Sequence, residues 1–92
     1  MLFYIIVYDI PDDKKCKKIS NLLEGYGQRV QYSVFECILN QRQYDELKKR
    51  LRKHINFSQD SLRFYPVTQH TFKQIETWGE PSVTQLPGST II

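Results

Sequence analysis

Residues 2–10 read LFYIIVYDI, and this stretch decides the fold of the chain. Residues 2–8 form an unbroken apolar, β-branched and aromatic run, which predicts a central strand with both faces covered. The run ends at Asp9. A carboxylate at the end of an apolar strand needs water, a cation or a hydrogen-bond donor, because an unpaired buried carboxylate is energetically costly. Asp9 is therefore the first candidate functional residue.

Residues 11–13, with the sequence PDD, predict the start of a helix directly after this strand. Proline suits the first helical turn, and the helix dipole favours acidic side chains there. Asp12 and Asp13 are thus better explained as helix-start residues than as catalytic acids. Gly25 and Gly27 bracket the end of the helix. The apolar side chains of this helix recur at helical spacing, at Cys16, Ile19, Leu22, Leu23 and Tyr26.

The rest of the chain continues to alternate between strands and helices. Residues 29–39 are rich in Val, Tyr, Phe and Ile, which predicts two strands or one strongly bent strand. Asn40 can cap a second helix, and residues 61–67 predict a strand that ends near Pro66. A short further strand is expected within residues 73–78. The buried stripe of the second helix is expected at Tyr44, Leu47, Leu51 and Ile55.

Strand, helix, strand, strand, helix, strand is the order of the split βαβ, ferredoxin-like fold. The sequence therefore predicts an α+β, ferredoxin-like βαββαβ sandwich with an extra short C-terminal strand, built from residues 1–79. Residues 80–92 shift in composition to Pro, Ser, Thr, Gln and Gly, which predicts a tail or an arm that docks elsewhere. Many unrelated functions use this fold, so it leaves the function open.

The net charge of +3 is small, but the basic residues are clustered. Four lysines lie within residues 14–18, and residues 41–53 hold six basic and two acidic side chains, a net charge of +4. Such clusters are the usual footprint of a nucleic-acid binder, although solvated helix faces explain them equally well from charge alone. The candidate nucleic-acid-binding residues are Lys14, Lys15, Lys18, Lys48, Lys49, Arg50, Arg52 and Lys53.

The chain of 92 residues is near the lower size limit for a self-sufficient core. Chains of this size often pair with a copy of themselves, so a two-fold homodimer is expected. Cys16 and Cys37 are too few for a disulfide framework, and with His54 and His70 they make no zinc pattern. Free thiols predict a reducing, cytoplasmic location. The apolar run is too short to span a bilayer, so no membrane partner is expected.

Two explanations of Asp9 stay open on physical grounds. Two copies facing each other in a dimer would make a two-carboxylate Mg²⁺ site that orients a water and stabilises charge on a scissile phosphate. Alternatively, Asp9 caps the following turn. Arg29 could clamp a phosphate or form a surface salt bridge. Tyr8 points to the opposite face from Asp9, which suits packing or an interface, and Ser33 lacks a histidine that would activate it as a nucleophile.

A family resemblance is carried by YDIPDDKKCKKISNLLEGYGQRVQYSVFEC at residues 8–37, LRFYPV at residues 62–67, and residues 75–79. Together they resemble the CRISPR-associated protein two family, the smaller of the paired spacer-acquisition proteins. The resemblance implies a homodimer whose sheets pack together and whose C-terminal strand is exchanged onto the partner. It also implies a Mg²⁺-dependent endonuclease acting on RNA or double-stranded DNA, with Asp9 as the metal-binding acid. The matching positions near that acid are Tyr8, Arg29, Ser33 and Phe35.

The same resemblance implies a role without catalysis. In this family the dimer bridges two dimers of the larger integrase and holds a DNA duplex through its backbone phosphates. The family often has two arginines on the first helix, at the positions of Cys16 and Lys18, and of these two only lysine can meet a phosphate. Endonuclease and non-catalytic scaffold are therefore both carried as hypotheses, with residues 80–92 as the arm that docks on the integrase. An RNA-recognition motif is disfavoured, because residues 35–39 lack its aromatic and glycine string.

Overall fold

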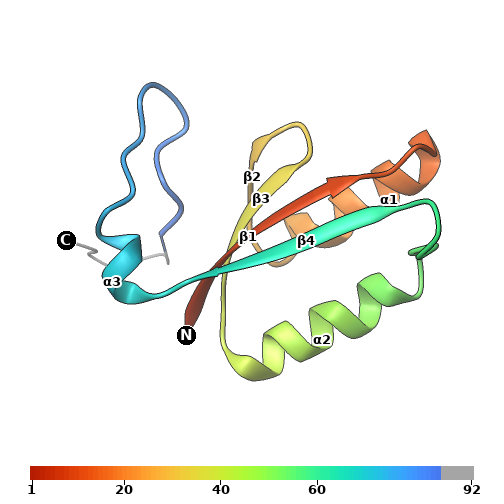
Figure 1. Cartoon of the computed structure of the whole chain (residues 1–92), viewed down its shortest axis with the longest axis horizontal. Coiled ribbons are helices and arrows are strands. Elements are labelled where there is room, and N and C mark those ends of the chain that lie inside the picture. Colours follow the sequence, from red (N-terminus) through yellow and green to blue (C-terminus); the bar gives the residue numbers. More distant parts are fainter. Residues whose placement is uncertain (86–92) are drawn as a thin grey trace.

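The computed structural model describes residues 1–85 of the chain. Its elements are β1 (Leu2–Asp9), α1 (Asp13–Glu24), β2 (Gln28–Gln31), β3 (Val34–Leu39), α2 (Gln41–Arg52), β4 (Ser61–Val67) and α3 (Gln69–Phe72). The antiparallel strands form one sheet in the order β2-β3-β1-β4, and α1 and α2 lie on the same side of it (Figure 1). This arrangement confirms the α+β, ferredoxin-like prediction. Within residues 1–85, no helix has the length and apolar character needed to cross a membrane.

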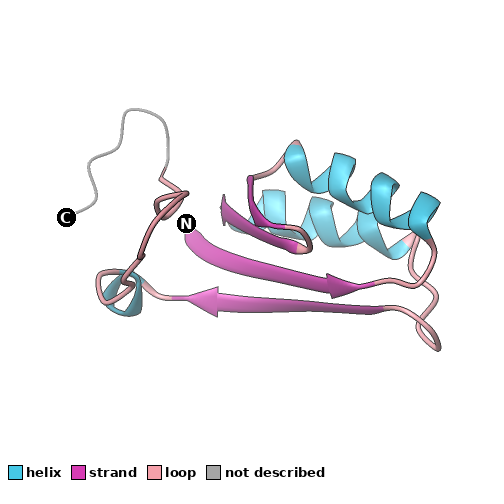
Figure 2. Ribbon diagram, turned by 90° about the horizontal axis from the view of Figure 1, so that it is seen from above, coloured by secondary structure: helices cyan, strands magenta, loops and turns pink. Residues whose placement is uncertain are grey.

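β1 is the central strand, as its apolar run predicted. It pairs with β3 on one side and β4 on the other, so that Ile6 lies opposite both Phe35 and Phe64. Side chains alternate along a strand, so Tyr4, Ile6 and Tyr8 share the face that packs against α1 and α2, which we call the inner face. All three are at most 5% exposed. The alternate residues of β1 point to the outer face, and Figure 2 shows both long helices on the other side of the sheet.

Both long helices begin where the sequence predicted. The side chain of Asp12 accepts hydrogen bonds from the backbone N–H groups of Lys14 (2.9 Å) and Lys15 (3.3 Å). Asn40 begins α2 with a capping box, because its side chain accepts from the N–H of Gln43 (2.7 Å) and the Gln43 side chain accepts from the N–H of Asn40 (3.0 Å). Such caps satisfy backbone donors that have no partner inside the helix.

The core lies between the inner face and the two helices. Ile19 and Leu23 of α1, and Leu47 and Leu51 of α2, are at most 2% exposed. Tyr44 of α2 stacks on Tyr4 with ring centroids 4.2 Å apart and meets Phe64 edge-on. The helix itself ends at Arg52, so the predicted stripe residue Ile55 lies beyond it, although its side chain still packs against the core. The buried stripes were therefore predicted correctly.

The expected short strand within residues 73–78 is not formed, which corrects the prediction. Instead, β4 is followed by α3, capped by Thr68, and residues 75–78 then run without regular structure. Phe72 of α3 packs on Phe3 of β1 with ring centroids 5.0 Å apart. A strand needs a neighbouring strand for its backbone hydrogen bonds, and α3 turns the chain away from β4 before such a neighbour is available.

The described part of the predicted tail returns to the sheet. Thr84 is 8% exposed, and its backbone N–H donates to Oε1 of Glu36 (3.0 Å) while its hydroxyl bonds Oε1 of Gln28 (3.3 Å). Residues 80–85 therefore contact the domain from which the sequence separated them. The division at residue 79 stays a prediction, because residues 86–92 lie outside the described part of the chain.

Candidate functional site

Asp9 lies at the end of β1 with its side chain exposed. Its backbone pairs with Ser61 of β4, and alternation places it on the outer face, opposite in direction to the buried Tyr8. Asp12, and not Asp9, accepts the helix-capping hydrogen bonds of α1. The capping alternative therefore has no hydrogen bond to support it in residues 1–85, and the carboxylate of Asp9 is open to solvent.

Residues 1–85 of one copy supply too few donors for a metal site. Within residues 1–85, no three His, Cys, Asp or Glu side chains come together in a group that could hold a metal ion. Mg²⁺ prefers carboxylate oxygens, commonly one or two, and completes its shell with waters and substrate phosphates. An exposed carboxylate such as that of Asp9 fits this donor chemistry, and a second copy of it would complete the protein's share of the shell.

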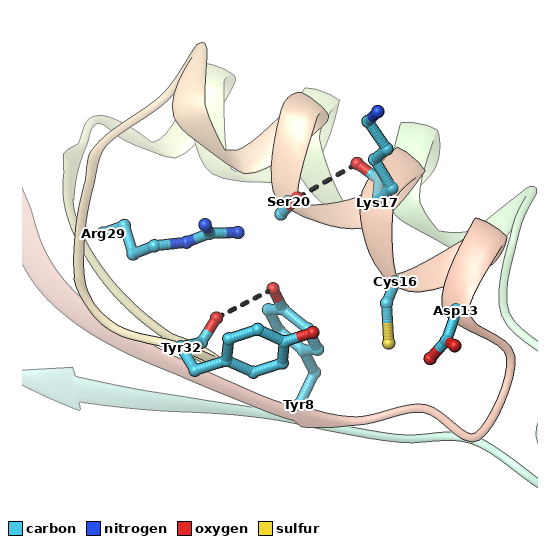
Figure 3. A pocket seen from close by; sticks show the side chains of 7 residues that line it. All are labelled: Tyr8, Asp13, Cys16, Lys17, Ser20, Arg29 and Tyr32. Carbon is cyan, nitrogen blue, oxygen red and sulfur yellow. Dashed lines mark hydrogen bonds between the residues drawn. The ribbon is translucent and has the colours of Figure 1, made fainter.

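A pocket of about 280 Å³ lies on the inner side of the sheet, between α1 and the β2–β3 hairpin (Figure 3). We call it the hairpin pocket. It brings together two residues singled out by the sequence, Tyr8 and Arg29, but Asp9 is not part of its wall. Its lining residues are Tyr8, Asp13, Cys16, Lys17, Ser20, Arg29 and Tyr32.

Arg29 enters the hairpin pocket over two aromatic rings. Its guanidinium carbon lies 5.3 Å from the ring centroid of Phe35 and 6.0 Å from that of Tyr32. Phe35 is fully buried beneath it and stacks on Tyr8 with centroids 6.3 Å apart. Rings at this distance attract a cation through their faces. In the described part of the chain no carboxylate forms an ion pair with Arg29, so the surface salt bridge considered from the sequence is absent there.

The turn between β2 and β3 is tied to β1 beside this pocket. The backbone N–H of Tyr8 donates to the carbonyl of Ser33 (3.1 Å), and the Tyr8 hydroxyl donates to the carbonyl of Tyr32 (3.4 Å). Ser33 therefore contacts Tyr8 through its backbone carbonyl and not through its hydroxyl. Phe35 contributes its buried ring as the floor under Arg29.

Cys16 lines the same pocket and is chemically quiet. Its Sγ lies 3.0 Å from the carbonyl of Ile10, to which the thiol donates. Burial first, and then the negative charges of Asp13 and other nearby carboxylates, raise the pKa of the Cys16 thiol above its ordinary value. Burial followed by the charge of Glu36 raises the pKa of Cys37 to about 12. Both cysteines are free and stay protonated, as predicted for core thiols.

Comparison with known proteins decides the family. The model of the family described as CRISPR associated protein Cas2 matches residues 1–75, which is most of the chain. The chain belongs to this family. The CRISPR-associated endoribonuclease Cas2 3 of Synechocystis sp. is 59% identical over 92 residues and covers all of both chains. The CRISPR-associated endonuclease Cas2 2 of Thermus thermophilus is 45% identical over 90% of this chain and 88% of its own.

A solved structure of the Cas2 family has the same fold in an assembly. A chain of a partial Cas6-RT-Cas1–Cas2 complex superimposes with a TM-score of 0.73 at 34% identity, covering 84% of this chain and 90% of its own. The family resemblance stated from residues 8–37 is therefore confirmed.

The candidate nucleic-acid-binding residues of this Cas2-family chain fall into two groups. Engaged residues contact another side chain of the protein, whereas open residues are exposed to solvent. Lys15 forms a 2.7 Å ion pair with Asp60, so it is held away from any external phosphate. Lys48 lies 4.2 Å over the ring of Tyr44 and 3.8 Å from Asp45. The remaining candidates are all exposed, and of these Arg50 contacts the ring and hydroxyl of Tyr26. The open candidates are Lys14, Lys18, Lys49, Arg52 and Lys53.

Two of these open cations, together with Arg50, line a second hollow between α1 and α2, which we call the interhelical groove. It has a volume of about 490 Å³, and its lining residues are Lys18, Asn21, Leu22, Arg50, Lys53 and His54. Lys18 therefore faces this groove, whereas its neighbour Lys17 lines the hairpin pocket. Arg50 is held by the hydroxyl of Tyr26, to which it donates at 2.9 Å. Among the described residues no acidic side chain lines this groove.

Four residues of the hairpin pocket on α1 and the β2–β3 hairpin were not predicted as site residues, namely Asp13, Lys17, Ser20 and Tyr32, and Cys16 was not predicted to line a pocket. Asp13, Lys17 and Ser20 lie three and four residues apart, together with Cys16, which is the spacing of a single helix face. That spacing could have indicated a shared wall. Tyr32 carried no such signal, because only the folded hairpin brings its ring next to α1. Asn21 and His54 were also not predicted as site residues, because only the folded arrangement of α1 and α2 brings them into one groove.

Proposed function

We propose that this chain is a CRISPR-associated, Mg²⁺-dependent endonuclease that hydrolyses phosphodiester bonds of RNA or DNA as a cytoplasmic homodimer. The observation that carries the proposal is Asp9, an exposed carboxylate at the end of the central strand, on the face that α1 and α2 leave open. The relatives named endoribonuclease and endonuclease support the same reaction class.

The outer face is suited to a second copy of the chain. Ile5, Val7, Val34 and Ile38 lie on it and are only half-buried, and Tyr65 of β4 is 44% exposed there. Glu36 and Arg63 lie among them on the same face, so the surface is mixed in character, and its half-buried apolar side chains support an interaction site there. A two-fold axis through this face near the end of β1 would bring the two Asp9 carboxylates together.

The two Asp9 carboxylates would hold the metal, one from each subunit, and share its charge with a substrate phosphate. When bound, Mg²⁺ supplies Lewis acidity at the phosphate and makes a bound water a better nucleophile. The carboxylate oxygens of Asp9 are hydrogen-bond acceptors and would orient such a water by accepting its hydrogen bonds. Basic side chains outside this centre hold the backbone on either side of the bond that breaks.

The test compares wild type with Asp9→Asn on labelled RNA and duplex DNA, with Mg²⁺ and with chelator, and measures gel-shift binding on the same samples. Asp9→Asn keeps the shape of the side chain but loses its charge, so cleavage should fall about a hundredfold or more while binding is retained. Glu24→Gln, at an exposed acid on the last residue of α1, is the matched control and should cleave like wild type. Equal cleavage by Asp9→Asn and wild type would refute the mechanism.

A second candidate function is a scaffold that binds nucleic acid without turnover and bridges the larger CRISPR integrase. The interhelical groove supports it, because Lys18, Arg50 and Lys53 line it with His54 and without an acid among the described residues. Such a groove suits backbone phosphates and reads no sequence. A similar chain forms part of a complex containing Cas1, which supports an integrase as the partner. The arm at residues 80–92 is proposed to dock on it.

The scaffold is tested by the double variant Lys18→Gln and Lys53→Gln. Each lost phosphate contact should reduce the slope of log affinity against log salt concentration by about 0.9 for duplex DNA, so the double variant should lose about 1.8. Lys73→Gln, an exposed lysine after α3, is the control and should keep the wild-type slope. An unchanged slope in the double variant would exclude the groove as the duplex-binding surface.

A further inference from the structure

The loop between α2 and β4 holds an exposed aromatic ring in a tight turn. Phe57 lies in this loop and is 77% exposed. The carbonyl of Asn56 accepts hydrogen bonds from the backbone N–H groups of Gln59 (3.1 Å) and Asp60 (2.8 Å), so the chain turns around Phe57. Single exposed apolar residues are common on protein surfaces, so exposure alone indicates no site.

Side chains on both sides of Phe57 fix this turn. Oδ1 of Asn56 accepts from the backbone N–H (3.0 Å) and the hydroxyl (2.7 Å) of Ser58. Oδ2 of Asp60 accepts from the backbone N–H of Asn56 (2.8 Å) and from Nζ of Lys15 on α1 (2.7 Å), and the Asp60 side chain is only 2% exposed. A turn that is fixed before a ligand arrives loses little conformational entropy on binding. The loop therefore presents Phe57 in a preorganised position.

The position of Phe57 along the chain links two proposed nucleic-acid contacts. His54, three residues before it, lines the interhelical groove, and Ser61, four residues after it, pairs with Asp9. An extended chain spans at most about 3.6 Å per residue, so the Cα atom of Phe57 lies within about 11 Å of that of His54 and within about 14 Å of that of Ser61. Figure 1 shows this loop at the end of the sheet where β1 and α2 both end. A strand that extends from the groove toward Asp9 therefore comes within reach of Phe57.

The charged side chains at this end of the molecule are compatible with a strand of nucleic acid. The charge of Asp60 is compensated by Lys15, whereas Asp12 caps α1 and Asp13 lines the hairpin pocket. Lys53 is exposed and forms no ion pair within residues 1–85. An exposed aromatic ring near basic side chains is the arrangement by which proteins bind single strands, because every base has a face that stacks on a ring.

We propose that Phe57 is a specificity-determining residue that stacks on an unpaired base of a strand running from the interhelical groove toward Asp9. The inference rests on the proposed function in taking nucleic acid as the ligand, and it adds a preference that Asp9 itself does not supply. The phenylalanine ring has no hydrogen-bonding group, so the contact selects unpaired bases and does not distinguish among them. A base inside a duplex is already stacked on its neighbours, so a blunt duplex gains nothing from this ring.

The experiment measures binding of a labelled single-stranded RNA and of a blunt duplex by fluorescence anisotropy, in chelator so that cleavage plays no part. Phe57→Ala should weaken single-strand binding about tenfold, because one stacking contact is lost, and should leave duplex binding unchanged. Phe57→Tyr keeps the aromatic face and should bind like wild type. Trp78→Ala is the matched control, because it removes a ring that is 93% exposed but lies on the segment after α3, at the other end of the molecule (Figure 1). Thermal melts establish that each variant is folded.

Two further measurements on the same proteins report on stacking and on cleavage. A purine analogue whose fluorescence is quenched by stacking is placed at successive positions of the single strand. At one position it should be quenched by wild type and by Phe57→Tyr but not by Phe57→Ala. With Mg²⁺, Phe57→Ala should raise KM for the single strand about tenfold and leave kcat unchanged, because the stacking contact is made equally before and during the reaction.

The outcomes separate this inference from the proposed function. Single-strand binding that is the same for wild type and Phe57→Ala would overturn the role of Phe57 and leave that of Asp9 untouched. Equal weakening of single-strand and duplex binding by Phe57→Ala would also overturn it, because stacking on an unpaired base would then not be the cause. Weaker single-strand binding by Phe57→Ala, together with wild-type cleavage by Asp9→Asn, would uphold the stacking contact and refute the metal mechanism. Absence of any nucleic-acid binding by wild type would remove the proposed function together with this inference.

Discussion

The two faces of one sheet differ in how completely a single chain covers them. On the inner face, Ile6 and Phe35 are fully buried by α1 and α2. On the outer face, the neighbouring Ile5 and Val7 are only half-buried, although they belong to the same apolar run. The inner face therefore stabilises the subunit, whereas the outer face has apolar area left for a partner. The apolar run predicted that both faces of β1 are covered, but within a single chain only the inner face is covered fully.

The largest loss of stability is expected from a substitution on the inner face. Ile6→Ala removes a fully buried side chain between β3, β4 and the helices, and should lower the free energy of unfolding by about 2–5 kcal/mol. Ile6→Val is the graded control, with an expected loss of about 0.5–1.5 kcal/mol. Denaturant unfolding at one protein concentration measures both. A loss below that of Ile6→Val for the alanine variant would contradict the contrast between the faces.

The next effect concerns the close approach of two strands at the entry to β2. A Cβ on Gly27 would overlap the carbonyl oxygen of Glu36 and the Sγ of Cys37, and would lie 2.9 Å from the Cys37 Cα. Backbone atoms cannot yield as a flexible side chain does, so Gly27→Ala should lower the free energy of unfolding by about 1–3 kcal/mol.

Gly25 provides the matched control for this change. It has a right-handed helical conformation, and its added Cβ would meet only the carbonyl of Leu22 at 3.4 Å. Gly25→Ala should therefore be close to neutral in the same unfolding measurement. Equal destabilisation by the two alanine variants would indicate that space at Gly27 is not the limiting factor.

Local patterns in the sequence predicted the elements whose causes are local. The apolar run gave β1, and Asp12 and Asn40 cap the helices that they precede, because a cap needs only nearby backbone donors. The short strand within residues 73–78 was wrong, because a strand depends on a neighbour that the sequence does not specify. Thr84 returned to the sheet for a similarly non-local reason, through Glu36 and Gln28.

In the candidate site, too, the sequence predicted individual residues but not the contacts that depend on the folded chain. Asp9 was identified because an acid that ends an apolar run is a local anomaly. Arg29 and Tyr8 were identified individually, but their common pocket depends on the packing of α1 against the β2–β3 hairpin. The division between Lys17 and Lys18 depends on the rotational phase of α1, which turns adjacent residues by about 100°. The number of basic residues in a segment could not show that Lys17 and Lys18 line different hollows.

A charge on the outer face tests the other half of the contrast. Val7→Lys places an ammonium group among the half-buried apolar side chains of this face, opposite Val34 on one side and Arg63 on the other. The proposed homodimer should then dissociate, and the proposed Mg²⁺-dependent cleavage should fall with it. The subunit should stay folded, with a change of about 0.5 kcal/mol or less.

Sedimentation at several protein concentrations measures the oligomeric state of Val7→Lys. Phe57→Lys, at a loop residue that is 77% exposed, is the control and should sediment like wild type. A Val7→Lys protein that remains dimeric and active would place the subunit contact elsewhere on the molecule.

The smallest effect on stability is expected from removing the ion pair that joins α1 to the loop before β4. Asp60 accepts from Lys15 (2.7 Å) and from the backbone N–H of Asn56 (2.8 Å), and these hydrogen bonds lower the pKa of the Asp60 carboxyl. Its stabilising contribution is therefore present above the unfolded pKa of about 3.9 and is lost as pH falls through the lower folded value. Melting temperature should decline less steeply below about pH 4 in Asp60→Asn than in wild type. Lys15→Gln removes the first of these causes, so the folded pKa of Asp60 should move back toward the unfolded value and the acid decline of the melting temperature should be shallower than in wild type. Parallel profiles for all three proteins would assign the acid sensitivity to other carboxylates.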